Sequence, residues 1–316
     1  MPQVVTFGET LAVLSPEHGE PLEAARHFSR TLGGAESNFA TALARLGHGV
    51  AYFTRLGDDG FGRSILKTLR GEGIDVSGVE FDERAPTGVM FKEVLFGAGR
   101  GGTVHVSYYR RFSAASALAL PDLAALNPKF VFATGITPAL SARNREETLR
   151  VLEHLAERHI PVVFDPNMRF KLWSADEARP VLRRMASLSD LALPGLDEGE
   201  LLTGESTPEN VAGALQGLGA RRVVVKLGTR GAYFSDGNET GFVDAYPVLE
   251  VDPLGAGDAF SAGVVSGLLD GLTLQEAARR GCALGAMCVT ARGDTTALPT
   301  RRELEDFQRG EYRPPR

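Results

Sequence analysis

The segment 252–263 combines two glycines, an aspartate and the start of an apolar helical pattern. Gly255 and Gly257 let the backbone approach a ligand closely, and the first turn of a helix offers unpaired N–H groups and a positive dipole end. These features favour a phosphate group, and in phosphoryl transfer such N–H groups stabilise the developing charge. Asp258, in the first turn, is placed to accept the proton of an acceptor hydroxyl. The alternative is structural: Asp258 caps the helix and the glycines form a tight turn.

The elements that would position these residues follow from the hydrophobic pattern. Short, continuous apolar runs alternate with helical patterns such as that over 143–158. Strands of this kind are buried on both faces, so the alternation predicts an α/β fold with a doubly wound, mostly parallel sheet flanked by helices. The predicted central strands lie at 130–133, 162–164, 191–193 and 223–225, a later hairpin pairs 231–234 with 241–244, and helices are predicted over 35–46, 61–70, 256–269, 274–290 and 301–307.

An early β-rich part interrupts this alternation. Residues 87–96 and 103–110 alternate like the two strands of a hairpin. The glycine cluster 97–102 between them matches the G-x-G-x-x-G pattern of dinucleotide sites, but a strand and not a helix follows it, so we interpret it as a hairpin tip. We expect a small β-sheet lid formed by segments 9–32 and 87–110, beside a single α/β domain that spans 1–316.

The string Asp252-Pro-Leu-Gly-Ala-Gly-Asp-Ala-Phe260 resembles the C-terminal signature of the ribokinase-like (PfkB) carbohydrate kinases, Asp-x-x-Gly-Ala-Gly-Asp-x-Phe. Leu32-Gly-Gly-Ala-Glu-Ser-Asn38 is similar to the N-terminal signature of the same family, so the resemblance spans almost the whole chain. It implies a sugar kinase of the ribokinase-like fold that uses ATP and Mg²⁺.

The resemblance also assigns roles to single residues. It implies that Asp258 is the catalytic base, that the anion hole consists of Gly255, Ala256 and Gly257, and that Gly34 and Asn38 contact the sugar. Taken without the family, the pair Gly33-Gly34 is a flexible turn before a helix.

Two further segments match the nucleotide and metal regions of the family. The string from Lys226 to Gly231 resembles its Lys-x-Gly-x-x-Gly nucleotide turn, although by itself it would be a glycine-rich hairpin bend. Gly195-Leu-Asp-Glu198 stands where the family has Asn-x-x-Glu; the Asn is replaced, but Glu198 can still carry the metal, since Mg²⁺ keeps several waters. The alternative is that Glu198 is only an acid in the first turn of a helix. The nucleotide-binding residues implied are Asn167, Lys226, Gly228, Gly231, Gly255 and Gly257.

The choice of sugar depends on aromatic and cationic side chains. Tyr108 and Arg110 close the early hairpin, and Arg169 follows an apolar strand, so the three could bind a carboxylate, or the arginines could lie on the surface. Within the family these strings most resemble the 2-keto-3-deoxygluconate kinases, which implies contacts from Ile136 and Asp294 as well. Met90 departs from that pattern, because an aromatic hydroxyl is expected there.

The resulting hypothesis is transfer of the ATP γ-phosphate to the terminal hydroxyl of a sugar acid. The alternatives are ribokinase or fructokinase activity on a neutral sugar and, from another class, a non-catalytic sugar- or nucleotide-binding regulator. A Rossmann dehydrogenase is a third possibility. A P-loop kinase is excluded, because the sequence contains no Gly-x-x-x-x-Gly-Lys-Ser/Thr motif.

Composition narrows the partners. The net charge of −6 argues against a nucleic-acid partner, and no long apolar run or secretory segment directs the chain into a membrane, so we expect a cytoplasmic protein. Cys282 and Cys288 are six residues apart in a helical pattern and project to different faces, which argues against a disulfide or metal pair. The exposed edges of the small sheet lead us to expect a homo-oligomer paired through the lid.

Overall fold

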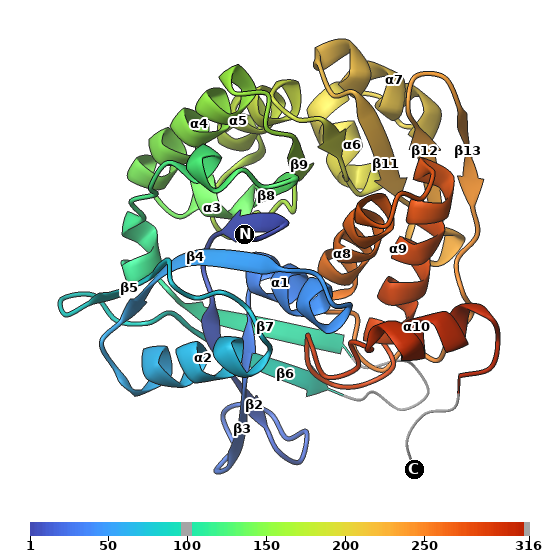
Figure 1. Ribbon diagram of the computed structural model, residues 1–316. Coiled ribbons are helices and arrows are strands. Elements are labelled where there is room, and N and C mark those ends of the chain that lie inside the picture. Colours follow the sequence, from blue (N-terminus) through green and yellow to red (C-terminus); the bar gives the residue numbers. More distant parts are fainter. Residues whose placement is uncertain (96–102, 313–316) are drawn as a thin grey trace.

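The computed structural model describes residues 1–95 and 103–312, so the predicted hairpin tip at 97–102 lies outside the described residues. A nine-stranded sheet forms the centre of the molecule, in the order β13-β12-β11-β10-β9-β8-β1-β4-β5 (Figure 1). Its pairs are parallel from β11 to β5, and β12 pairs antiparallel with both of its neighbours, β11 and β13. The predicted α/β fold with a doubly wound, mostly parallel sheet is confirmed. The strands are β1 (Val4–Phe7), β4 (Val50–Gly57), β5 (Val79–Asp82), β8 (Phe130–Thr134), β9 (Val162–Asp165), β10 (Leu191–Ala192), β11 (Arg222–Lys226), β12 (Ala232–Ser235) and β13 (Thr240–Val243).

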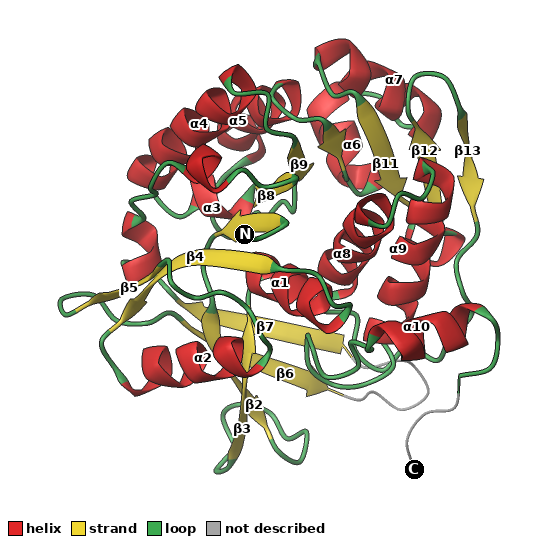
Figure 2. Ribbon diagram, viewed as in Figure 1, coloured by secondary structure: helices red, strands yellow, loops and turns green. Residues whose placement is uncertain are grey.

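Helices cover both faces of this sheet (Figure 2), and each face has its own apolar core. One core holds α1 (Ala35–Arg45), α2 (Gly60–Gly71), α8 (Ala256–Leu269), α9 (Leu274–Cys288) and α10 (Arg301–Gln308) against the sheet. The other holds α4 (Ala142–Glu157), α5 (Ala175–Ser187), α6 (Leu196–Thr203) and α7 (Pro208–Leu218). Shorter helical turns are α3 (Ile136–Ala139) and the 3₁₀ segments Ala114–Ala117, Leu123–Leu126 and Gly228–Arg230.

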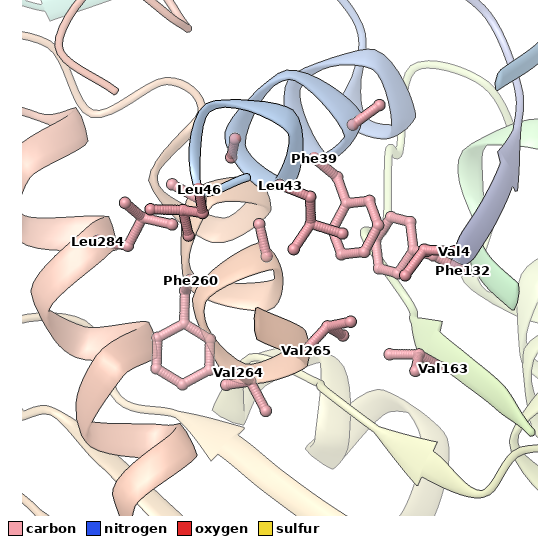
Figure 3. Close-up of a cluster of buried hydrophobic side chains, with 14 of the residues drawn as sticks. Val4, Phe39, Leu43, Leu46, Phe132, Val163, Phe260, Val264, Val265 and Leu284 are labelled. Carbon is pink, nitrogen blue, oxygen red and sulfur yellow. The ribbon is translucent and has the colours of Figure 1, made fainter. Parts of the chain in front are cut away.

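The first core fixes two helices that matter for the site. Phe39 of α1 stacks on Phe132 of β8 with ring centroids 3.8 Å apart, while Val264 and Val265 of α8 lie in the same cluster (Figure 3). Full burial of such side chains contributes roughly 1.5–3 kcal/mol each, so the positions of α1 and α8 are tied to the sheet.

A second, four-stranded sheet has the order β3-β2-β6-β7 and lies at the bottom of the view in Figure 1. Leu11, Val13 and Met90 are buried on its inner face. Phe28, Phe91 and Tyr109 form edge-to-face aromatic pairs on the other face. The strands are β2 (Leu11–Pro16), β3 (Phe28–Gly33), β6 (Val89–Leu95) and β7 (Thr103–Tyr109). No helix in the described part of the chain is long and apolar enough to cross a membrane.

Candidate active site

The N-termini of four helices meet at the cavities of the molecule, and all four begin at glycine. Gly34, Gly135, Gly195 and Gly255 are the residues before α1, α3, α6 and α8. The other α-helices begin at Ser, Thr or Asp residues whose side chains accept a hydrogen bond from the first turn. Glycine has no side chain to cap a helix, so the first N–H groups of α8 have no capping acceptor and are available to a ligand. At α3 and α6, in contrast, Thr134 and Glu198 accept N–H groups from Ile136 and Gly195.

Asp258 lies in the first turn of α8 and is only 7% exposed. Its two carboxylate oxygens accept hydrogen bonds from two neutral amides: Asn38 Nδ2 at 2.9 Å and Asn167 Nδ2 at 3.1 Å. Burial raises the pKa of Asp258 from its ordinary value of 3.8 to about 6, against the opposing effect of the Asn38 hydrogen bond. A carboxylate of this kind is ionised at neutral pH and remains basic enough to accept a proton.

One cavity contains Asp258 and the inner face of the small sheet; we call it the inner cavity. All the residues that the sequence analysis assigned to the substrate line it, which brings together segments from both sheets. They are Gly34, Asn38, Tyr108, Arg110, Ile136, Arg169, Asp258 and Asp294, and Met90 lines it as well.

The two arginines of the inner cavity differ in their surroundings. Arg110 is buried, pairs with Glu9 at 2.7 Å and lies 5.2 Å from the centre of the Tyr108 ring. Its Nε is buried and has no hydrogen-bond partner among the described residues, so one donor remains for a ligand. Arg169 is exposed and donates from one guanidinium nitrogen to the carbonyl of Met168.

Two larger cavities continue from the inner one. The middle cavity, about 630 Å³, shares Arg169, Gly255 and Asp258 with the inner cavity and has polar walls. The outer cavity, about 580 Å³, shares Lys226 and Gly257 with the middle one. Its remaining walls are mainly apolar and include Tyr246, Pro247, Val248, Phe260, Ala286 and Val289. The series of cavities therefore offers an apolar compartment, a polar compartment over the start of α8, and a smaller one with hydrogen-bonding groups.

The predicted nucleotide residues line the middle and outer cavities. Asn167 and Gly255 line the middle one, Gly231 lines the outer one, and Lys226, Gly228 and Gly257 line both. Asn167 has a φ of 40°, a left-handed conformation that is uncommon for a residue other than glycine. This conformation accompanies the hydrogen bond from its side chain to Asp258.

Lys226 is held at the junction of these cavities by Asp165. Its Nζ lies 2.9 and 2.8 Å from the two carboxylate oxygens, and Ser261 donates to the same carboxylate. Burial lowers the pKa of Lys226, but attraction to Asp165 and Glu198 outweighs it and raises the pKa above its ordinary value. The ammonium is therefore charged at neutral pH and suits an anionic ligand such as a phosphate.

The donor set at Glu198 fits a water-mediated magnesium site better than direct coordination. Its two carboxylate oxygens accept the backbone N–H groups of Met168 and Gly195, at 2.8 and 2.7 Å. Within the described residues, no group of three acidic, His or Cys side chains could hold a metal by itself. Mg²⁺ commonly keeps several waters and takes its other ligands from phosphate oxygens, so Glu198 and the neighbouring Asp197 are suitable partners for such waters.

Two glycines at the site have no room for a side chain. A Cβ on Gly34 would lie 2.3 Å from the carbonyl oxygen of Glu9. Gly255 has a φ of 85°, and its Cβ would lie 2.6 Å from the carbonyl oxygen of Asp294. The predicted contact residues Gly34 and Gly255 are thus also places where the chain approaches itself closely.

Several buried charged residues of the site were not predicted from the sequence. Glu36 is fully buried, accepts hydrogen bonds from Thr134 and Thr137, and its pKa is raised by burial to about 7. Asp165, Glu9 and Lys92 were also missed. Asp165 ends an apolar strand and precedes a proline, and Lys92 is a cation inside a strand pattern; both signals were available, but their partners lie far away in the sequence.

A doubly wound sheet, an uncapped helix N-terminus beside a basic carboxylate, and adjoining apolar and polar cavities are the features expected of a sugar kinase. The model of the pfkB family of carbohydrate kinases matches residues 1–301. The chain belongs to this family, and it is an ATP-dependent carbohydrate kinase.

Relatives cover nearly the full length of the chain. It is 42% identical to a 2-dehydro-3-deoxygluconokinase of Bacillus subtilis over 96% of this chain and 94% of the relative. A 2-dehydro-3-deoxygluconokinase of Thermoproteus tenax is 34% identical over 97% of this chain and 94% of its own. Fructokinase-1 of Oryza sativa is 34% identical as well, over 95% and 96%.

A solved structure provides the nucleotide comparison. It is a protein of E. coli assigned as a ribokinase II, in complex with ATP and Mg²⁺. The TM-score is 0.89 at 26% identity, and the match covers 98% of this chain and all of the other. The similarity of fold therefore extends across both sheets.

Proposed function

We propose that this kinase phosphorylates the terminal hydroxyl of 2-keto-3-deoxygluconate, the compound also called 2-dehydro-3-deoxygluconate, to give 2-keto-3-deoxy-6-phosphogluconate. The observation that carries this proposal is the presence of two guanidinium groups, Arg110 and Arg169, in the cavity that contains Asp258. Guanidinium groups match the planar geometry of a carboxylate, which a sugar acid has and a neutral sugar lacks. The 42% identity to a kinase named for this substrate supports the same assignment.

The reaction requires a base at the acceptor hydroxyl. Asp258 takes the proton of that hydroxyl as the oxygen attacks the γ-phosphorus, and the bond from phosphorus to the ADP oxygen breaks. The amides at 255–257, at the start of α8, lie where the charge of the transferred group develops. Lys226 faces the same region with a protonated ammonium.

Mg²⁺, when bound with the nucleotide, neutralises phosphate charge and polarises the transferred group. Glu198 would hold it through water, because its oxygens already accept two backbone N–H groups. Asn167 would contact the nucleotide side of the site while its amide keeps Asp258 in place.

Recognition of the acid depends on donors that remain free of protein partners. Arg110 forms an ion pair with Glu9, but its Nε has no hydrogen-bond partner in the described part of the chain. Arg169 is exposed and can turn toward the ligand. Tyr108 lines the same cavity and supplies a hydroxyl, and Gly34, Asn38, Ile136 and Asp294 complete its wall.

The alternative substrate is a neutral sugar such as fructose or ribose. It is favoured by one observation: the close ion pair between Arg110 and Glu9 neutralises one of the two cations in the cavity. The identity of 34% to a fructokinase agrees with this alternative.

Release of ADP, measured across a panel of 2-keto-3-deoxygluconate, fructose and ribose, decides between the two. We expect kcat/KM for the acid to exceed kcat/KM for either neutral sugar by about 100-fold or more. A factor of this size corresponds to roughly 3 kcal/mol, which charge-assisted hydrogen bonds to the carboxylate can supply. Equal rates with fructose or ribose would contradict the assignment.

A variant separates recognition of the carboxylate from general effects. Arg169→Met should raise KM for the acid about tenfold and leave the kinetics with fructose unchanged, because one charge-assisted hydrogen bond is worth about 1.5–3 kcal/mol. Arg111, an exposed neighbour of Arg110 that does not line the inner cavity, provides the matched control as Arg111→Met.

We further propose that residues 1–316 form one domain in which the small sheet, built on segments 9–32 and 87–110, closes over the substrate. Closure would exclude water that could otherwise hydrolyse ATP. The contact from Lys171 Nζ to the carbonyl of Val106, at 2.6 Å, joins the small sheet to the loop after β9 and supports this role.

We also propose that two copies pair through the outer faces of their small sheets. Tyr109 is 66% exposed there beside Phe28 and Phe91, an aromatic surface that a second copy could cover. Light scattering should show a dimer or a larger assembly that Tyr109→Glu dissociates, and a monomeric wild-type protein would refute the pairing.

A further inference from the structure

A buried ammonium group connects the small sheet to the turn that opens α8. Lys92 projects from β6, is 2% exposed, and its Nζ lies 2.6 Å from Asp252 Oδ2 and 2.8 Å from Asp294 Oδ1. Both carboxylates are buried as well, at 1% and 7% exposure. Such a group is stable only with its partners, because each charge alone would carry a large desolvation cost.

The two carboxylates belong to the chain segments that adjoin Gly255. Asp252 begins the turn, and its oxygens accept N–H groups from Leu254 at 3.2 Å and from Gly293 at 2.9 Å. The backbone of Asp294 approaches Gly255 closely, so that a Cβ there would be 2.6 Å from its carbonyl oxygen. The ammonium therefore holds together both chain segments that enclose the first residue of the proposed anion hole.

Asp294 is also part of the wall of the inner cavity. While Oδ1 pairs with Lys92, Oδ2 accepts a hydrogen bond from Asn38 Nδ2 at 3.4 Å. Oδ2 also lies next to Gly33, another residue of the cavity wall, where a Cβ would be 3.0 Å away. The orientation of Asp294 toward a bound sugar thus depends on Lys92. Attraction of Asp294 and Asp252 outweighs burial and raises the pKa of Lys92, so the ammonium stays charged.

We propose that Lys92 is a positioning residue: its ammonium, supplied by the small sheet, fixes Asp252 and Asp294 around Gly255 and so sets both the anion hole and the sugar-facing carboxylate. The inference rests on the kinase function proposed above. It makes the small sheet a structural part of the catalytic turn in addition to a cover. The outer cavity, walled by α8, α9 and the 245–250 segment, is lined by none of Lys92, Asp252 and Asp294.

The test is Lys92→Met, which keeps the length of the side chain and removes its charge. We expect kcat to fall about 100-fold, the usual effect of a small displacement of groups that orient a reaction. KM for the sugar should rise about tenfold, since the orientation of one charged hydrogen-bonding group is lost. KM for ATP should stay within about twofold, because a change of that size corresponds to only about 0.4 kcal/mol. The comparison uses the sugar that wild type phosphorylates fastest, so an error in the assigned substrate does not affect it.

Two controls separate positioning from loss of folded protein. Leu155→Ala creates a cavity in the core of the opposite face; it should lower stability and leave both KM values unchanged. Lys67→Met removes an exposed ammonium from α2 and should match wild type in all three parameters.

If Lys92→Met does not fold, the double variant Lys92→Met with Asp252→Asn removes a carboxylate together with the ammonium. It should fold, and its KM for the sugar should still rise about tenfold because Asp294 remains without its partner. Wild-type kcat and sugar KM in the folded variant, or equal increases in both KM values, would overturn the inference.

Discussion

Asp258→Asn should remove nearly all phosphoryl transfer and leave nucleotide binding intact. The amide has the shape of the carboxylate but cannot accept a proton, and general bases contribute about 10²–10⁴-fold to the rate. We therefore expect kcat to fall at least about 100-fold, with the dissociation constant of ATP changed by less than about threefold, or 0.7 kcal/mol. In the wild type, kcat/KM for the sugar should decline below about pH 6, where Asp258 becomes protonated.

The same variant should change how stability depends on pH. The pKa of Asp258 is about 6 in the folded chain against 3.8 for the free side chain, and at about 1.36 kcal/mol per pKa unit the ionised form destabilises the fold by about 3 kcal/mol. Below pH 3.8 both states are protonated and the penalty is absent. It builds up as the pH rises from 3.8 to 6, because the unfolded chain loses its proton first.

The amide that Asp258→Asn introduces cannot ionise, so the variant gains stability relative to wild type as the pH rises. The variant also loses a hydrogen bond from Asn38 or Asn167, which lowers its free energy of unfolding by about 1–2 kcal/mol at every pH. This constant difference cancels when the stabilities at two pH values are compared. Urea unfolding at pH 4 and pH 8 should show the variant gaining about 2–3 kcal/mol on wild type between them. A parallel pH dependence, or a variant that keeps most of its activity, would refute the reasoning about Asp258.

Three further expectations follow from residues of the same site. Gly255→Ala should lower kcat at least tenfold and the free energy of unfolding by about 2 kcal/mol, because Ala is strained at this φ and its Cβ would meet the carbonyl of Asp294. Gly271→Ala is the control, since Gly271 has a φ of 81° but open space around it and should show only the effect of the strain. Equal losses of stability in thermal unfolding of the two variants would contradict the clash. Burial raises the pKa of Glu36 to about 7, so the contribution of this group to wild-type stability should fall as the pH rises from 4.5 to 7. Glu36→Gln cannot ionise and should not show this fall. Urea unfolding with the same pH dependence in variant and wild type would contradict the expectation. Lys226→Met should raise KM for ATP at least tenfold and cost roughly 3–5 kcal/mol, because Asp165 stays buried without its cation, and an unchanged KM would remove Lys226 from the nucleotide site.

The central fold was predictable because its strands are buried on both faces. Such strands are continuous apolar runs, and those predicted at 130–133, 162–164 and 223–225 agree with β8, β9 and β11. β3 was missed because its sequence, Phe-Ser-Arg-Thr-Leu-Gly, places three exposed residues on an edge of the small sheet. β5 was missed as a four-residue edge strand with partly exposed side chains. Edge strands gain their structure from a neighbour more than from their own pattern.

The candidate site was predictable where its residues stand close together in the sequence. The turn from Asp252 to Asp258 carries its chemistry within seven residues, and the sequence predicts its helix to begin at Ala256, as observed. The ion pairs that connect distant segments could not be predicted in this way. Lys92 and Asp294 are 202 residues apart, and Lys226 and Asp165 are 61 apart, so only the fold brings them into contact.

The arrangement of buried charges explains why Asp258, among several carboxylates, is suited to be the base. The oxygens of a carboxylate that pairs with an ammonium or guanidinium group are occupied by that cation, so they are less free to accept a hydrogen bond from a substrate hydroxyl. Asp258 instead accepts hydrogen bonds from the neutral amides of Asn38 and Asn167, and burial raises its pKa to about 6. The paired carboxylates are Asp165 with Lys226, Asp252 and Asp294 with Lys92, and Glu9 with Arg110. Placing a cation beside Asp258, for example by Asn38→Lys, should therefore lower its pKa and move the acidic limb of kcat/KM below pH 6; a limb that stays at pH 6 would show that another group controls it.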